Sequence, residues 1–328
     1  IERLCYQGKR SMGALEFVPA QDNYLELSTG LEIKTLIETA REVLDEKKKL
    51  DVNLNVDTKE AVANIIRVGT SAGGQRAKAV IAYNETTGDI RSGQIEAPDG
   101  FSHWLIKLDG VTNNELGDPK HYGRIEYVYY LMARDAGIDM SECRLIEENG
   151  RAHFMTKRFD RVNGNEKLHM QTLCGMAHYD YKMIHAYSYE QVFQVMRRLR
   201  LSYSDAEQMF RRMVFNVVAR NQDDHTKNIS FLMDRQGKWS LSPAYDVSWA
   251  YNPKGIWTSN HQMSINNKSD EITRDDLLSV ARNVNIKHAD QIIDQVIESV
   301  SHWPDLAKEY GIPDDIEKAI NSTLLLDM

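Results

Sequence analysis

Strand-like runs fill the first half of the chain, and helical patterns dominate only after residue 159. This order of strands before helices restricts the possible folds more than any other property of the sequence. The segments KAVIAYN (78–84) and HWLIKL (103–108) have the composition of strands. Asn149-Gly150 separates two further strand-like runs within 143–160 and predicts a β-hairpin.

The second half carries the helical patterns. Candidate capping boxes, in which a Ser or Asp precedes Gln or Glu by three residues, occur at 57–60, at Ser188 with Gln191 and at Ser204 with Glu207. An apolar stripe of Phe210, Met213, Val214 and Val217 indicates a packed helix face. An earlier helical pattern, 125–137, ends at Gly137. Three more follow residue 270, in DDLLSVARNV, DQIIDQVIESVSHW and DDIEKAINSTLL.

Strands followed by helices predict an α+β fold with two lobes. We place a strand-rich lobe at 1–157 and a mainly helical lobe at 158–328, joined by a short hinge near 157–161, because no Pro- or Ser-rich linker interrupts the chain.

Charge and cysteine content exclude several classes of protein. The net charge of −8 argues against bulk electrostatic binding to nucleic acid; the pairs Arg197-Arg198 and Arg211-Arg212 are interpreted as solvated helix faces. Three widely spaced cysteines argue against a disulfide framework and favour a reducing compartment. No apolar run approaches the roughly 18 residues of a membrane span, so we expect a cytoplasmic protein without membrane contact.

Residues 221–228, NQDDHTKN, concentrate acids, amides, a histidine and a lysine between apolar runs. A helix leads into this loop, a hairpin follows it, and the segment PAYD ends at Asp246. This order can bring Asp223, Asn228 and Asp246 together, and Mg²⁺ prefers such hard oxygen ligands. In phosphoryl transfer an Asp orients the attacking hydroxyl, an Asn five residues later binds metal, and a further Asp bridges metal and phosphates. The sequence therefore predicts a magnesium-dependent phosphoryl-transfer site.

Upstream residues supply the other parts of such a site. The loop GTSAGGQRAK (69–78) has small residues whose N–H groups can approach phosphate oxygens, and it lacks the Gly-Lys-Ser/Thr of a Walker A sequence. Lys107 on a strand is a candidate to neutralise the phosphates, and Glu126 on the next helix is a candidate to pair with it.

Each of these residues also has a structural interpretation. A glycine-rich turn often only connects a hairpin, a strand lysine can extend to solvent, and Glu126 can be a solvated helix residue. His225 can be a structural hydrogen-bonding residue, and Lys227 can neutralise phosphate or lie on the surface. Asp223, Asn228 and Asp246 together favour chemistry, because a solvent-facing loop has no need of such clustered acids.

Several of these motifs together resemble the HipA-like serine/threonine kinases, the toxins of bacterial type II toxin–antitoxin modules. The matching segments are GTSAGGQRAKAVIAYN, WLIKL, IEYVYYLMARDAGI, KRFDR, NQDDHTKNISFL and LSPAYDVSWA. The resemblance covers the chain from about residue 8, and its most specific part is D-x-H-x-x-N with S-P-x-Y-D. The order D-x-H-x-x-N is also similar to that of phosphoinositide kinases.

The resemblance implies a bilobal, protein-kinase-like fold that binds ATP and Mg²⁺. It makes Asp223 the catalytic base, with Asn228 and Asp246 as metal ligands and Lys107 at the phosphates. It also implies adenine against the backbone near Lys157 and Phe159, with Asp160 near the ribose. The catalytic candidates are then Asp223, Lys107 and Lys227. The ATP-binding candidates are Gly69, Thr70, Ser71, Ala72, Gly73, Gly74, Lys107, Lys157, Phe159, Asp160, His225 and Asn228.

Regulation and partners also follow from the resemblance alone. Ser71, with Thr70 as a competitor, falls where HipA-type kinases autophosphorylate a loop serine, and a phosphate there would repel those of ATP. Family members bind a helix-turn-helix antitoxin, through which they contact DNA, and phosphorylate proteins that include aminoacyl-tRNA synthetases. Relative to full-length members, we expect most of the family's N-terminal subdomain to be absent from this sequence, and HMQTLCG (169–175) departs from the usual acidic stretch.

Two other functions are compatible with the sequence. One is a kinase of a lipid or small molecule, which the phosphoinositide-kinase-like order of the loop favours. The other is a non-catalytic corepressor that acts with the antitoxin, against which the intact acidic set argues.

Overall fold

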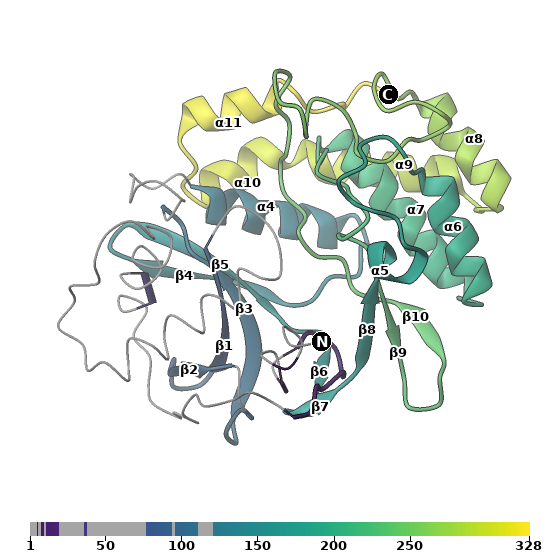
Figure 1. Cartoon of the computed structure of the whole chain (residues 1–328). Helices are drawn as coiled ribbons and strands as arrows, with labels where there is room; N and C mark the ends of the chain where they lie inside the picture. Colours follow the sequence, from purple (N-terminus) through teal and green to yellow (C-terminus); the bar gives the residue numbers. More distant parts are fainter. Residues whose placement is uncertain are drawn as a thin grey trace. The chain divides into compact units, whose positions relative to one another are not determined.

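The chain forms two compact units, each built from two segments. The structure, a computed structural model, describes residues 5, 8–9, 11–19, 36–37, 77–93, 96–110 and 121–328. Unit 1 comprises Ile1–Arg124 and Glu142–His169, and unit 2 comprises Ile125–Ser141 and Met170–Met328. Unit 1 is rich in strands and unit 2 is mainly helical (Figure 1), so the predicted α+β fold class is confirmed. The predicted domain bounds of 1–157 and 158–328 stay a prediction.

Unit 1 is organised around an antiparallel five-stranded sheet of order β2-β1-β3-β5-β4. Its strands are β1 (Lys78–Asn84), β2 (Ile90–Ser92), β3 (Phe101–Lys107), β4 (Cys143–Glu148) and β5 (Arg151–Lys157). The strands predicted at 78–84 and 103–108 are thus confirmed as β1 and β3. A short hairpin of β6 (Arg161–Val162) and β7 (Glu166–Lys167) follows, which the sequence did not predict.

The β4–β5 turn shows why local sequence specified this part of the sheet. Asn149 and Gly150 have φ values of 45° and 77°, the left-handed conformation that a tight two-residue hairpin turn requires at both positions. The predicted hairpin is confirmed, with Glu148 paired to Arg151. The buried face of the sheet carries Trp104, which is fully buried.

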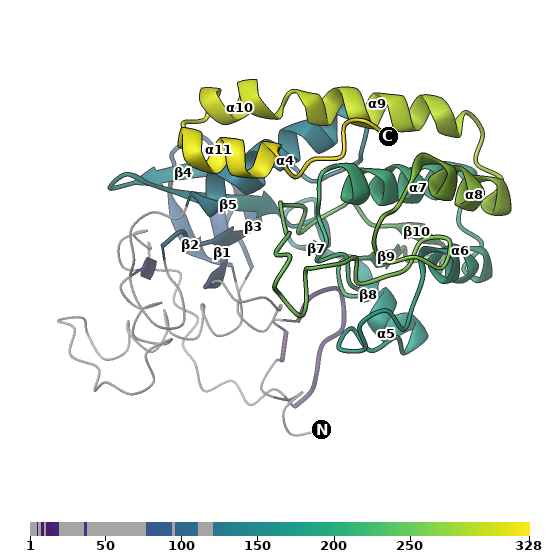
Figure 2. The same ribbon diagram turned by 90° about the horizontal axis from the view of Figure 1, so that it is seen from above.

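Unit 2 contains helices and a small sheet of order β10-β9-β8. The strands are β8 (His169–Thr172, whose first residue belongs to unit 1), β9 (Ser230–Met233) and β10 (Trp239–Leu241). The helices are α4 (Tyr122–Asp135, from Ile125 on), α5 (Leu173–Ala177), α6 (Tyr189–Arg198), α7 (Tyr203–Val218), α8 (Arg274–Val284), α9 (Ala289–Ser301), α10 (Trp303–Glu309) and α11 (Asp314–Asn321). Helices α6, α7, α8 and α9 lie together in both views (Figures 1 and 2).

The starts of two helices test the predicted capping boxes. Ser188 caps α6, with reciprocal bonds to Gln191, as predicted. The box at Ser204 is wrong, because α7 is capped two residues earlier by Ser202, whose side chain and backbone exchange hydrogen bonds with Asp205. Only Ser204 with Glu207 fits the sequence pattern, because Asp205 stands three residues after Ser202 where the pattern has Gln or Glu; the carboxylate of Asp205 nevertheless accepts the Ser202 N–H as a capping box requires. The box predicted at 57–60 lies outside the described residues.

Helix α7 forms the centre of the unit 2 core. The predicted stripe of Phe210, Met213, Val214 and Val217 is confirmed, since all four side chains are fully buried. Tyr129 of α4 packs edge-on against aromatic neighbours and donates its hydroxyl to the Ala219 carbonyl at 2.7 Å. This carbonyl belongs to the C-terminal cap of α7, so the packing fixes the point at which the chain enters residues 221–228.

The helix predicted from the pattern DQIIDQVIESVSHW is too long by two residues at its C-terminal end. The pattern predicted through Trp303 ends as α9 at Ser301, and a new helix, α10, begins at Trp303. Pro304 explains the break, because proline suits the first turn of a helix but not its interior. Within the part of the chain that the structure describes, none of the helices combines the length and apolar character needed to cross a bilayer.

Candidate active site

The loop 221–228 of unit 2 is held by the segment that follows β8. The Leu173 N–H donates to the Ile229 carbonyl at 2.8 Å, and the Cys174 N–H donates to the Thr226 carbonyl at 3.0 Å. The Thr226 hydroxyl in turn donates to the Tyr179 carbonyl at 2.8 Å. Three hydrogen bonds from a distant stretch of chain therefore fix a loop that is not itself part of a helix or strand.

The structure brings Asp223 and Asn228 together at their backbone. The Asn228 side-chain N–H donates to the Asp223 carbonyl at 2.8 Å, which orients the amide and leaves its oxygen available to another partner. The Asp223 side chain is about half exposed (51%), and its Oδ1 lies 3.9 Å from Nε2 of His225. The carboxylate proposed as a base is accordingly accessible to a substrate from solvent.

Asp246 shares a cavity with Asn228. This cavity has a volume of about 30 Å³, and its polar lining includes Asn216, Asn221, Asp224, His225, Asn228 and Asp246. Asp246 has a φ of 56°, an uncommon conformation for a residue with a side chain. The Asp223 side chain is not among the lining groups, so its predicted convergence with Asp246 stays a prediction.

The donor set of this cavity fits magnesium. An amide oxygen from Asn228 and a carboxylate from Asp246 are hard donors, and Mg²⁺ takes few protein ligands and fills its octahedron with water and phosphate oxygens. Among the described residues there is no group of three or more His, Cys, Asp or Glu suited to a metal. Magnesium bound by Asn228 and Asp246 would take its remaining ligands from water and phosphate oxygens.

Buried polar side chains hold the segment that leads to Asp246. The Tyr245 hydroxyl donates to the Lys227 carbonyl at 2.5 Å and contacts the Ser230 hydroxyl. Burial raises the pKa of Tyr245 above its ordinary range, so the hydroxyl keeps its proton and remains a donor. These contacts join the end of the 221–228 loop to the residue next to Asp246.

Arg211 and Arg212 correct the interpretation of this basic pair as a solvated face. Both side chains are buried, at 9% and 8% exposure. Burial lowers the pKa of Arg212 to about 10, and its guanidinium donates to the Ser242 carbonyl at 2.8 Å. The guanidinium stays charged at neutral pH and holds the segment between β10 and Asp246. The apolar side chains around the pair masked this role in the sequence.

His225 and Lys227 both contact Tyr181. Lys227 Nζ lies 3.6 Å from the centroid of the Tyr181 ring, and the His225 ring meets that ring edge-on at 5.6 Å. Nδ1 of His225 is buried and has no hydrogen-bond partner in the described part of the chain. The structure thus gives both residues an aromatic contact, and their predicted roles toward phosphate and ATP stay predictions.

The predicted phosphate residues are divided among several parts of the chain. Lys107 ends β3 in unit 1, is 7% exposed, and places Nζ 5.6 Å from the centroid of the Phe154 ring. Glu126 lies on the part of α4 that belongs to unit 2 and is 2% exposed. Their pairing stays a prediction, and the glycine-rich loop from Gly69 to Gly74, with Thr70, Ser71, Ala72 and Gly73, lies outside the described residues.

The predicted hinge residues lie in unit 1. Lys157 ends β5, pairs with Glu85 at 3.0 Å, and lies 5.6 Å from the centroid of the Trp104 ring. Phe159 follows two residues later and is partly buried. The side chain of Lys157 is thus engaged at the sheet, and the backbone around Lys157 and Phe159 remains the predicted adenine contact.

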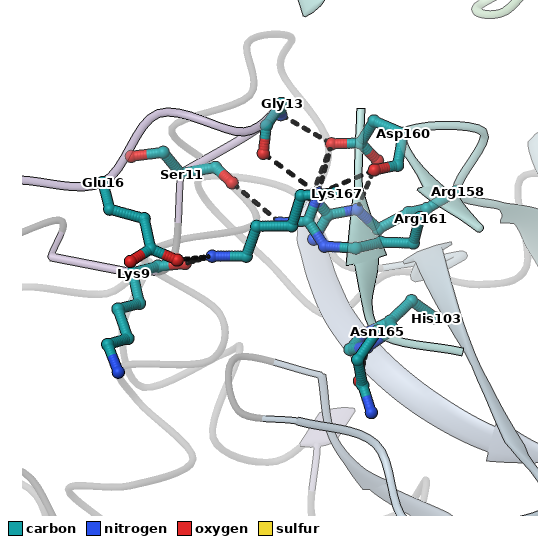
Figure 3. Close-up of polar contacts among 10 residues, drawn as sticks. All are labelled: Lys9, Ser11, Gly13, Glu16, His103, Arg158, Asp160, Arg161, Asn165 and Lys167. Carbon is teal, nitrogen blue, oxygen red and sulfur yellow. Dashed lines mark hydrogen bonds and ion pairs between the residues drawn. The ribbon is translucent and has the colours of Figure 1, made fainter. Parts of the chain in front are cut away.

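Asp160 has an environment that the sequence did not predict. Its carboxylate accepts hydrogen bonds from Arg158, from Arg161 and from the Gly13 N–H, and the Asp160 side chain is only 3% exposed (Figure 3). Burial alone would raise the pKa of Asp160, but the two guanidinium groups outweigh it and hold the pKa below its ordinary value. In unit 1 this carboxylate binds an N-terminal segment, and its predicted contact with ribose stays a prediction.

Several polar residues of the site were missed by sequence reasoning. Asp224 is 3% exposed and accepts hydrogen bonds from Tyr189, His261 and the Gln262 backbone. His261, Gln262 and Met263 are all buried, so no alternating pattern in this segment signals the contact with Asp224. Nothing in the pair Asp223-Asp224 shows which acid is buried.

A strand-rich unit, a mainly helical unit and a loop that joins an exposed Asp to an Asn five residues later define a kinase-like class of fold. The chain belongs to the HipA-like family, because residues 70–303 match the HipA-like C-terminal domain. The predicted family is therefore confirmed.

Individual relatives agree with this assignment. In Sinorhizobium fredii, the protein named "Putative kinase Y4mE" is 26% identical over 44% of this chain and 33% of that protein, and the one named "Putative kinase Y4dM" is 25% identical over 61% and 50%. The chain thus spans about half or less of these curated relatives. HipA, solved with HipB and operator DNA from Shewanella oneidensis, matches with a TM-score of 0.67 at 16% identity, over 97% of this chain and 74% of that one, which shows a shared fold.

Proposed function

We propose that this protein is an ATP- and Mg²⁺-dependent serine/threonine protein kinase of the HipA type. The observation that carries the proposal is the fixed loop of unit 2, in which the half-exposed Asp223 is bonded through its carbonyl to Asn228, which shares a cavity with Asp246. Such a loop supports the proposal, because phosphoryl transfer uses a base with two oxygen ligands for the metal close by.

Each residue has a distinct role in the proposed reaction. Asp223 orients the substrate hydroxyl and accepts its proton as the oxygen attacks the γ-phosphorus, while the bond from that phosphorus to the β,γ-bridging oxygen breaks and ADP leaves. Asn228 and Asp246 would hold a magnesium ion, and that ion would supply positive charge that neutralises the phosphates. Lys107 and Lys227 are the cations proposed to neutralise the transferred group further.

Regulation and partners extend the proposal. Autophosphorylation of Ser71, or of Thr70, would add negative charge to the glycine-rich loop and oppose ATP binding. The fold shared with HipA, solved with HipB and operator DNA, supports a helix-turn-helix antitoxin as a partner, with DNA contacted through it. The proposed substrate is a protein hydroxyl, with aminoacyl-tRNA synthetases as the first group to test.

Replacing Asp223 by Asn tests the proposal. The purified chain is incubated with Mg-ATP and bacterial lysate, and phosphorylated residues are mapped by mass spectrometry. We expect transfer by the wild type and none by Asp223→Asn, with nucleotide binding by calorimetry retained in both. Equal transfer by the variant would refute the role of Asp223.

The same experiment separates the alternatives. With radiolabelled ATP, label in a lipid or metabolite rather than in a protein band would support the second kind of kinase. Absence of both ATP binding and autophosphorylation in the wild type would support the corepressor. Asp234→Asn is a suitable control, because this acid caps the exposed turn after β9 and has no place in the proposed chemistry.

A further inference from the structure

The acid next to the proposed base is buried and occupied by protein donors. Asp224 Oδ2 accepts the Tyr189 hydroxyl at 2.8 Å and lies 2.9 Å from His261 Nδ1, and its Oδ1 accepts the Gln262 N–H at 2.7 Å. The Asp224 and His261 side chains are each 1% exposed. A buried carboxylate requires such donors, because its transfer from water is costly without them. The three bonds therefore determine where the Asp224 side chain can lie.

The hydrogen bonds that begin at Asp224 continue to the start of the loop 221–228. The Asn216 side-chain N–H donates to the Tyr189 hydroxyl oxygen at 2.9 Å, and the Asn221 side-chain N–H donates to the Asn216 amide oxygen at 2.8 Å. Residues 221 and 224, which flank Asp223, are thus joined through side chains of α6 and α7. Burial and the nearby Asp224 charge raise the pKa of Tyr189 well above its ordinary value, so its hydroxyl remains the donor to Asp224.

We infer that Asp224 is a positioning residue, which holds the backbone at Asp223 in the orientation that catalysis requires. This inference rests on the proposed function. The two neighbouring acids have different roles. Asp223 is half exposed and is the proposed base, whereas Asp224 is buried and joins the loop by hydrogen bonds to α6 and to residues 261–262. Displacement of a reacting group by about 1 Å can lower a rate by roughly 100-fold.

The test variant is Asp224→Asn, which keeps the shape of the side chain but turns one acceptor oxygen into a donor that faces other donors. We expect kcat for phosphoryl transfer to fall by about 10- to 100-fold, while KM for ATP changes less than about twofold. Hydrogen exchange of the peptide that covers 221–228, followed by mass spectrometry, should become faster. Tyr189→Phe, which removes one of the three donors, should shift both readings in the same direction by less.

Asp276→Asn is a matched control within unit 2. Asp276 is 4% exposed and accepts hydrogen bonds from Asn266, Lys268 and Thr273 at the start of α8. Its replacement also disrupts a buried carboxylate network and lowers Tm, but it should leave kcat and the exchange of 221–228 unchanged.

Two outcomes would overturn the inference. One is an unchanged rate and unchanged loop exchange in Asp224→Asn. The other is an equal loss of kcat in Asp224→Asn and Asp276→Asn at equal loss of Tm, which would make the role of Asp224 one of general stability. If the wild type transfers no phosphate, the proposed function fails, and loop exchange still decides whether Asp224 orders residues 221–228.

Discussion

Replacing Asp160 by Asn should destabilise unit 1 by about 4 kcal/mol, because removing one partner of a buried ion pair typically costs about 3–5 kcal/mol. The Asp160, Arg158 and Arg161 side chains are 3%, 5% and 5% exposed, so the two guanidinium groups would remain buried without a counter-charge. The Gly13 N–H, now 2.6 Å from the carboxylate, would lose a charged acceptor as well.

Hydrogen exchange is a suitable assay because it reports on unit 1 apart from unit 2. About 4 kcal/mol corresponds to a roughly 1000-fold faster exchange of amides that open only when unit 1 unfolds. Peptides that cover β3 and β5 should show this change, and peptides that cover α7 and α9 should change far less. The rates are measured at neutral pH, where the carboxylate of the wild type is ionised.

Glu16→Gln is the matched control for this perturbation. Glu16 pairs with Lys167 at 2.5 Å in the same contact region (Figure 3), but the two side chains are 43% and 23% exposed. An exposed ion pair contributes at most about 1 kcal/mol, so exchange should accelerate by less than about tenfold. If Asp160→Asn cost no more than Glu16→Gln, the reasoning that burial makes the Asp160 contacts stabilising would be refuted.

The pH dependence of unit 1 gives a second check on Asp160. Its pKa is lower in the folded protein than in the unfolded chain. The carboxylate therefore contributes stability that is complete above the ordinary pKa of aspartate and is lost as the pH falls through the lower, folded-state pKa. In acid unfolding, the wild type should lose this contribution to its free energy of unfolding as the pH falls. Asp160→Asn lacks the carboxylate, so its free energy of unfolding should not show this loss.

Two further predictions concern unit 1. Gly123→Ala should cost about 3 kcal/mol or more by urea unfolding, because a Cβ there would lie 2.0 Å from the Ala152 carbonyl oxygen, whereas Gly175→Ala, with its nearest contact at 3.4 Å, should cost far less. Burial and the nearby Arg151 charge lower the pKa of His153 from 6.5 to about 4. The wild type should therefore lose up to about 3 kcal/mol as the pH falls from above 6.5 to below 4, and His153→Leu should lack this slope; an identical slope in the variant would exclude His153 as its source.

Local signals explain what the sequence could predict. The turn at Asn149-Gly150 and the cap at Ser188 depend on residues within a few positions of one another, so their patterns were readable. The cap at Ser202 was missed because Asp205 stands where the capping-box pattern has Gln or Glu, whereas Ser204 with Glu207 fits that pattern. Pro304 marked a helix boundary that the apolar repeat alone had hidden.

The site was only partly predictable because its supports are distant in the sequence. Asp223 and Asn228 are joined across five residues, and their spacing was recognisable. Asp224 meets His261 across 37 residues, and Asp160 meets Gly13 across 147. No periodicity or motif connects such pairs, since their contact is created only by the folded chain.

The division of each unit into two segments affects how the protein can be made in the cell. Residues 125–141 leave the ribosome before the rest of unit 2 exists, and the Ser299 hydroxyl that bonds to the Met132 carbonyl is 167 residues further on. Val128 and Met132 belong to the same hydrophobic core as residues of α7 and α9, which are translated later, so this part of the core is missing while only residues 125–141 have been made. A nascent chain halted at residue 169 would therefore expose an apolar helix, a natural target for a chaperone or a protease.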